Sequence, residues 1–74
     1  MSTRKRYWVV PHSTNWQVKH EGRVLSTHVL KSDAVDAGVK IAKANVPSQL
    51  TVLRQDGTIE YERTYRDDPY PPVG

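Results

Sequence analysis

Apolar and polar residues alternate along much of the chain, and this two-residue period predicts strands. Trp16 and Val18 alternate with polar neighbours and are expected to point into the core. Pro11 cannot donate a backbone hydrogen bond, so the first strand is expected to lie at a sheet edge or to stop there. The five predicted strands cover, in chain order, residues 7–12, 16–20, 23–30, 50–53 and 59–65.

Between the third and fourth predicted strands, apolar residues recur with the period of a helix. Ser32 is the predicted N-cap, because its hydroxyl can accept a hydrogen bond from a free backbone N–H group. Asp33 and Asp36 follow in the predicted first turn, where negative charge is favoured, and Pro47 ends the helix. The predicted apolar stripe consists of Val35, Val39, Ala42 and Val46, widened by Ala34 and Gly38.

Turn-forming and strand-breaking residues divide the chain into one domain with two short ends. Asp56 and Gly57 stand between two β-rich segments and predict a hairpin, since glycine tolerates positive φ. We expect residues 1–6 to form a disordered basic arm and residues 7–65 to form one α+β domain. Residues 66–74 are expected to be a proline-rich extended tail, because prolines cannot continue a strand ladder.

These elements predict an α+β two-layer sandwich in the order β-β-β-α-β-β, with one helix packed on an antiparallel or mixed sheet. A helix is about 10–12 Å across, whereas five strands spaced about 4.8 Å apart are roughly twice as wide. Part of the apolar sheet surface therefore needs another cover, either a second copy in a homodimer or the docked tail. The candidate interface residues are Trp8, Val10, Leu53, Tyr70 and Pro71.

The formal net charge of +3 is unevenly distributed along the chain. Residues 1–31 contain six Lys and Arg residues against one acid, whereas residues 32–74 contain five against seven acids. The basic half suits a polyanion such as DNA or RNA, and it equally suits pairing between copies or an ordinary solvated surface. The candidate nucleic-acid contacts are Arg4, Lys5, Arg6, Trp8, Lys19 and Arg23.

The sequence offers little material for catalysis or metal binding. It has no cysteine, which excludes disulfides and cysteine-bound metals. His12, His20 and His28 recur every eight residues and could together bind zinc, but no carboxylate pair accompanies them. The serines lack the setting of a nucleophile, and the histidines have no orienting acid at a recognisable spacing. We therefore predict no catalytic residues, no metal, no cofactor and no enzymatic activity.

The ends and the apolar runs of the chain bear on its location. The N-terminal segment is basic, but it lacks the hydrophobic region and cleavage site of a signal peptide. No apolar run approaches the length of a membrane span. We therefore expect a cytoplasmic protein that does not interact with a membrane.

Two separated motifs resemble a known family. VVPHSTNWQVKHEG near the start and LTVLRQDGTIEYERTYRDDPYPPVG at the end are similar to the small bacterial family called domain of unknown function 2188. The resemblance extends from Tyr7 to Gly74 and departs at Arg66, where the family usually has glycine. It implies a fold and a bacterial source, but no assigned activity and no site residues.

The sequence therefore predicts a small, non-enzymatic binding module. Its expected mode of action is self-association as a homodimer together with binding of an unidentified protein partner. The alternative is binding of DNA or RNA through the basic arm and the N-terminal hairpin.

Overall fold

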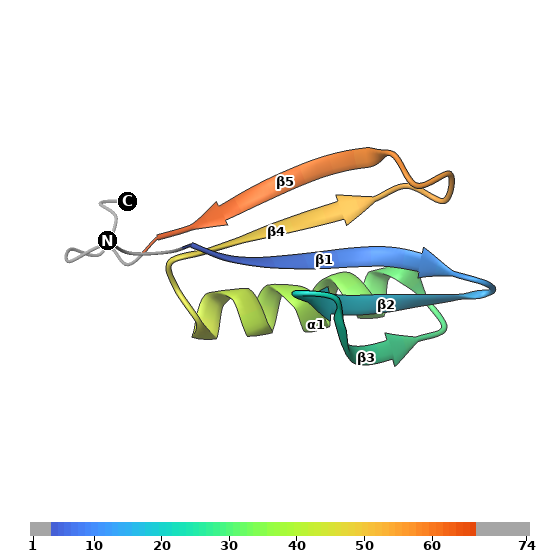
Figure 1. The fold of residues 1–74 in the computed structure, drawn as a ribbon. Helices are drawn as coiled ribbons and strands as arrows, with labels where there is room; N and C mark the ends of the chain where they lie inside the picture. The colour runs from blue at the N-terminus through green and yellow to red at the C-terminus, as the bar shows by residue number, and fades with distance from the viewer. Residues whose placement is uncertain (1–3, 67–74) are drawn as a thin grey trace.

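The computed structural model describes residues 4–66, which form one five-stranded sheet and one helix (Figure 1). The elements are β1 (Lys5–His12), β2 (Asn15–His20), β3 (Arg23–His28), α1 (Lys31–Ala44), β4 (Ser48–Leu53) and β5 (Ile59–Tyr65). The strand order in the sheet is β3-β2-β1-β4-β5, with β1 and β4 parallel and all other pairs antiparallel. The predicted α+β class and the element order are confirmed.

β1 is the middle strand of the sheet, so the edge position, one of the two alternatives predicted from Pro11, is wrong. The other alternative is close to what is observed, because the strand ends at His12, one residue after Pro11. The pairing of β1 with β4 ends at Val9, so Pro11 has a neighbouring strand on the β2 side only. β1 also begins earlier than predicted. Lys5 and Arg6, which were expected in a disordered arm, are its first residues, and the Lys5 N–H donates to the Pro47 carbonyl at 3.1 Å.

The helix begins two residues earlier than its predicted cap implies. Leu30 occupies the N-cap position with an extended backbone and no side-chain cap, so Ser32 lies inside the first turn and the predicted Ser32 cap is wrong. β3 correspondingly ends at His28 and leaves Val29 exposed in the connection. The helix ends at Ala44, before Pro47, and the Asn45 side chain donates to the Ile41 carbonyl at 2.8 Å.

The core lies between α1 and one face of the sheet, which we call the covered face. The small residues of the predicted stripe, Ala34, Gly38 and Ala42, form the buried centre of the helix. Val35 and Val39 lie half-buried at its margin, and Val46 follows the end of the helix. A methyl group on Gly38 would stand 3.0 Å from a Leu50 methyl carbon, so glycine allows this close approach of helix and sheet. The buried apolar residues are Tyr7, Val9, Trp16, Val18, Ala34, Ala42, Leu50 and Val52.

β5 is the edge strand of the sheet farthest from α1, which packs mainly against β1, β2, β3 and β4 (Figure 1). It follows the predicted hairpin, in which Gly57 has a φ of 91° and the Arg54 N–H donates to the Thr58 carbonyl at 2.7 Å. Residues 67–74 of the predicted tail, and residues 1–3 of the predicted arm, lie outside the described residues. Within residues 4–66, the helix is too short and too polar to cross a membrane.

Candidate functional site: the open face of the sheet

The sheet face opposite α1, which we call the open face, carries the alternate residues of the same strands. Its central row can be followed by strand register from Lys19 to Trp8, from Trp8 to Thr51, and from Thr51 to Glu62. Trp8 is half-buried there, and Thr51 is only 2% exposed. A basic residue on β2 and an acidic residue on β5 therefore stand at opposite ends of one row that passes through a tryptophan.

The open face also carries an apolar patch formed by Trp8, Val10, Leu53 and Ile59. Val10 and Leu53 are the next residues after the last paired residues of β1 and β4, and both are half-buried. Ile59 pairs with Leu53 and is 49% exposed. The fold thus brings together three of the five predicted interface residues, Trp8, Val10 and Leu53. The other two, Tyr70 and Pro71, lie outside the described residues.

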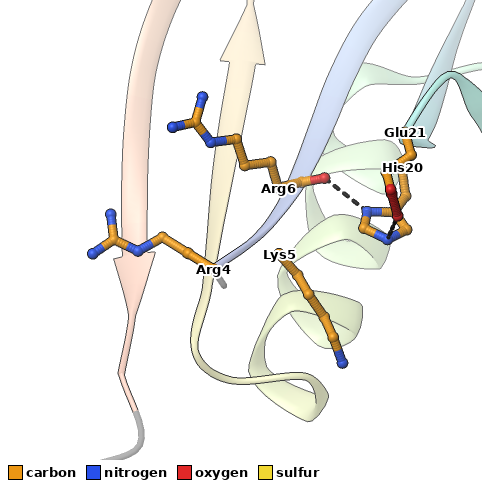
Figure 2. Close-up of a pocket in the computed structure, with 5 residues that line it drawn as sticks. All are labelled: Arg4, Lys5, Arg6, His20 and Glu21. Atoms are coloured by element: carbon orange, nitrogen blue, oxygen red, sulfur yellow. Dashed lines mark hydrogen bonds and ion pairs between the residues drawn. The ribbon is translucent and has the colours of Figure 1, made fainter. Parts of the chain in front are cut away.

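A cavity of about 390 Å³ lies at the start of β1, and we call it the basic corner. Figure 2 shows the side chains of Arg4, just before β1, and of Arg6 extending toward β4 and β5, whereas that of Lys5 extends away from them. An Arg4 guanidinium nitrogen donates to the Gln49 side-chain oxygen at 3.4 Å, which holds Arg4 over β4. The residues that line the cavity are Arg4, Lys5, Arg6, His20 and Glu21.

His20 closes the inner side of the basic corner. Its ring stacks on Tyr7 with a centroid separation of 4.6 Å and an interplanar angle of 26°. The Arg6 carbonyl can only accept, so His20 Nδ1 is the donor in their 2.9 Å contact. His20 Nε2 lies 3.1 Å from a Glu21 carboxylate oxygen. The Glu21 carboxylate, the one acid of the corner, therefore lies beside the histidine, and within residues 4–66 no ion pair joins it to Arg4, Lys5 or Arg6.

Tyr7 links the corner to the core. Burial raises the pKa of the Tyr7 hydroxyl above its ordinary value, and the negative charge of Glu21 raises it further. Both causes disfavour the tyrosinate, so Tyr7 stays neutral under His20 at ordinary pH. The corner is thus charged on its outer side and packed with neutral aromatic surface on its inner side.

Four of the six predicted nucleic-acid contacts reach the same side of the molecule. Arg6, Trp8 and Lys19 belong to the open face by strand alternation and register, and Arg4 joins them through Gln49. The other two are elsewhere. Lys5 precedes the covered-face residue Tyr7 by two positions, and Arg23 pairs with His20 beside a second cavity, of about 380 Å³.

The three histidines do not converge. His20 pairs with Tyr7 near the start of β1, whereas His12 is the last residue of β1 and His28 pairs with Trp16 near that opposite end. Within residues 4–66, no three metal-ligating side chains form a group that could hold an ion. The zinc hypothesis weighed for the sequence therefore has no geometric support.

Sequence analysis did not identify several residues of the open face. Thr51 and Glu62 alternate with covered-face residues, which places them on the open side, whereas Ile59 faces Leu53 only because the register shifts between Val52 and Leu53. Strand order then puts Thr51 beside Trp8 and Glu62 beside Thr51. Lys31 was missed as well; it forms an ion pair with Glu60 and stands over the Trp16 ring, 5.1 Å from its centroid. No local pattern signals this contact, because it joins residues 29 positions apart.

Comparison with known proteins places the chain in a family. No match was found among curated proteins or solved structures. The family model described as an uncharacterized protein conserved in bacteria (DUF2188) matches residues 7–65. The match ends with β5 and does not include the tail, to which the sequence resemblance extended. Because the matched segment is the whole sheet and helix apart from the first two residues of β1, the chain belongs to this bacterial family.

Proposed function

We propose that the protein is a binding module that self-associates through the open face of its sheet. The observation that carries the proposal is the apolar patch of Trp8, Val10, Leu53 and Ile59 on the face opposite the helix. Burial of apolar surface contributes roughly 25 cal/mol per Å², so the complex with a partner that covers this patch is stabilised in proportion to the apolar area removed from water.

The charges beside the patch favour a second copy as the partner. Lys19 on β2 and Glu62 on β5 lie at opposite ends of the row that contains Trp8 and Thr51. A two-fold axis parallel to the strands, lying between two open faces, places β2 of one copy over β5 of the other. Each Lys19 then meets a Glu62 from its partner, and each Trp8 lies over a Thr51. The row is therefore complementary to itself in charge.

The size of the open face sets the strength of such a dimer. Five strands of about six residues make a face of roughly 24 by 20 Å, which is below the about 800 Å² per partner of a standard interface. We therefore expect a reversible dimer whose population rises with protein concentration, not a permanent one.

Sedimentation equilibrium from micromolar to millimolar protein tests the proposal. Lys19→Glu and Glu62→Lys should each weaken the dimer at least about tenfold, because each places like charges opposite each other. Combining the two reversals should restore dimerisation. Lys40→Glu, on the exposed side of the helix, is the matched control and should dimerise normally. Monomers throughout the range, or a double variant no better than the single ones, would refute the model.

Nucleic-acid binding is a second candidate, supported by a different observation. Arg4, Arg6 and Lys19 lie on the same open sheet surface as Trp8, and such a surface can stack an unpaired base while neutralising phosphates. Trp8 is the more exposed of the two tryptophans, so quenching of its fluorescence should report binding.

The test of this candidate is titration with single-stranded and duplex DNA and with RNA at several salt concentrations. Phosphate contacts predict that affinity falls steeply with added salt. Arg6→Gln should weaken binding, whereas Lys43→Gln, an equal loss of charge on the helix, should change it less. Absence of quenching at low salt, or affinity that is independent of salt, would exclude this candidate.

A further inference from the structure

β3 has one backbone edge that is not part of the sheet. It is an end strand, and among residues 4–66 it pairs with β2 alone. The N–H and C=O groups along such an edge can pair with another extended chain. β5, at the opposite end of the sheet, carries Glu60, Glu62 and Arg63, and such charged side chains discourage the addition of a strand. β3 carries only Arg23, at its start, so the two edges are protected unequally.

Exposed apolar side chains are concentrated on and just after β3. Within residues 4–66, four of the five large hydrophobic residues that stay exposed lie between positions 24 and 30. Val24 and Leu25 belong to β3 and are 45% and 40% exposed, and Val29 and Leu30 follow the strand. The backbone at Leu30 is still extended. A strand added to β3 would therefore cover apolar surface as well as form backbone hydrogen bonds.

A β-bulge places one of these residues beside a cavity. Val24 and Ser26 pair with adjacent residues of β2, so Leu25 is the extra residue of β3. Bulges at sheet edges redirect side chains in this way. The second cavity, of about 380 Å³, is lined by His20, Glu21, Arg23 and Leu25. It lies at the start of β3 and is large enough to hold a side chain of an added strand.

The charges near this edge favour an acidic partner. Within residues 4–66, no ion pair includes Arg23 or Lys19, the residue of β2 that pairs with Val24. The Glu21 carboxylate, the one acid of the cavity, lies 3.1 Å from His20 Nε2. A carboxylate can therefore approach Arg23 without breaking an existing ion pair. A second copy of β3 would bring another arginine and no acid, so charge disfavours pairing of β3 with itself.

We propose that the outer edge of β3 binds an extended, acidic segment of a partner protein as an additional strand. Hydrogen bonds to the β3 backbone hold the segment, an apolar side chain enters the cavity beside Leu25, and an acidic side chain meets Arg23. The site is the backbone edge of the sheet and not its open face. It therefore does not depend on the self-association proposed above.

The experiment is an amide NMR titration of the full chain, at micromolar concentration, with synthetic peptides as probes. A five-residue peptide of alternating glutamate and valine, blocked at both ends, should shift the signals of residues 23–30. At saturation it should slow hydrogen exchange of β3 amides at least about fivefold. The same peptide with lysine for glutamate should bind at least about tenfold more weakly. Replacing its valines by proline keeps the charge but removes backbone donors, and should abolish binding.

Arg23→Gln tests the charge contact on the protein side. It should weaken binding of the glutamate–valine peptide about threefold, the effect expected of one exposed ion pair. Arg63→Gln, an equal loss of charge at the opposite edge of the sheet, is the matched control and should leave the affinity unchanged. Both arginines are exposed, and native dispersion of the remaining signals checks that each variant is folded.

Four results would overturn the inference. Absence of shifts at millimolar peptide, or shifts centred on β5 or on the open face, would mean that β3 is not the site. Equal affinity for the glutamate and lysine peptides would exclude recognition of acidic segments. Undiminished binding of the proline peptide would exclude strand addition. Exchange of β3 amides that slows with protein concentration, without peptide, would mean that a second copy occupies the edge instead.

Discussion

The two faces of the sheet are built from alternate residues of the same strands, yet their surroundings differ. On the covered face, Val9 and Val52 pair side by side under the helix and are fully buried. On the open face, the preceding residues of the same strands, Trp8 and Thr51, also pair, but Trp8 keeps part of its surface exposed. Packing therefore comes mainly from one face, and the other retains apolar area that a partner can remove from water.

The difference between the faces follows from the composition of the helix. Ala34, Gly38 and Ala42 present little side-chain volume, so the helix approaches the sheet closely and seals the residues beneath it. A single helix cannot reach both faces. The same strands therefore contribute a dry layer under the helix and an amphipathic layer on the outside.

The largest expected effect comes from leucine truncation on the two faces. Leu50→Ala removes a fully buried side chain and should lower the free energy of unfolding by about 2–5 kcal/mol. Leu53→Ala changes a leucine of the same strand on the open face. It should lower the free energy of unfolding of the monomer by about 1 kcal/mol, because Leu53 is only partly buried. Urea denaturation at micromolar protein measures both, and equal losses would contradict the assignment of the faces.

Gly38 tests how closely the helix and the covered face pack. Gly38→Val places a carbon 3.0 Å from Leu50 Cδ1 and 3.3 Å from Val9 Cγ2, and neither neighbour has space to move because both are fully buried. We expect a loss of about 1–3 kcal/mol in the free energy of unfolding. Lys40→Val, on the exposed side of the same helix, controls for helix propensity and should cost less than about 1 kcal/mol. A stabilised Gly38→Val variant would show that the layers can separate.

The strands and the helix were predictable because local periodicity determines them. Trp16 and Val18 alternate with polar residues and are buried as predicted, and Leu50 and Val52 oppose Leu53 as predicted. The helix boundary was missed because Ser32 is a favourable cap in sequence terms. Capping preference is worth about 1 kcal/mol and is overruled here by the extended backbone at Leu30.

Strand order was the information that the sequence could not supply. Pro11 argued for an edge strand, but β1 can be central because β4 pairs with its first five residues only. The candidate site depended on this order, since Glu62 joins the row of Lys19 and Trp8 only because β4 lies between β1 and β5. These contacts join residues far apart in sequence, and no local pattern encodes which strands become neighbours.

A smaller effect distinguishes two buried hydroxyl groups on the two faces. The Ser48 hydroxyl donates to the Ala42 carbonyl at 2.6 Å, which satisfies the last turn of the helix. Ser48→Ala should therefore cost about 1 kcal/mol in the free energy of unfolding. The Thr51 hydroxyl makes only a 3.4 Å contact to the exposed Glu62. Thr51→Val should therefore change the free energy of unfolding by less than about 0.5 kcal/mol. A larger loss for Thr51→Val than for Ser48→Ala, measured in urea, would reverse this ranking of the faces.

The smallest expected effect is a dependence on alkaline pH, and it arises where the covered face meets the basic corner. Burial and the Glu21 charge raise the pKa of Tyr7 in the folded protein. Above the unfolded pKa of about 10, the unfolded chain loses this proton more readily than the folded one, so stability falls as pH rises. Below that pH the contribution is fully present.

Thermal unfolding of the native chain between pH 8 and 11 should therefore show a steeper decline than that of Tyr7→Phe, which has no proton to lose. Lysines also titrate in this range, but both proteins share them, so the difference isolates Tyr7. Glu21→Gln should lie between the two, because it removes the second cause of the raised pKa and leaves burial in place. Tyr61→Phe, on the less buried β5, serves as the control. If this variant reduced the decline of stability with pH as much as Tyr7→Phe does, the decline would not report on the covered face.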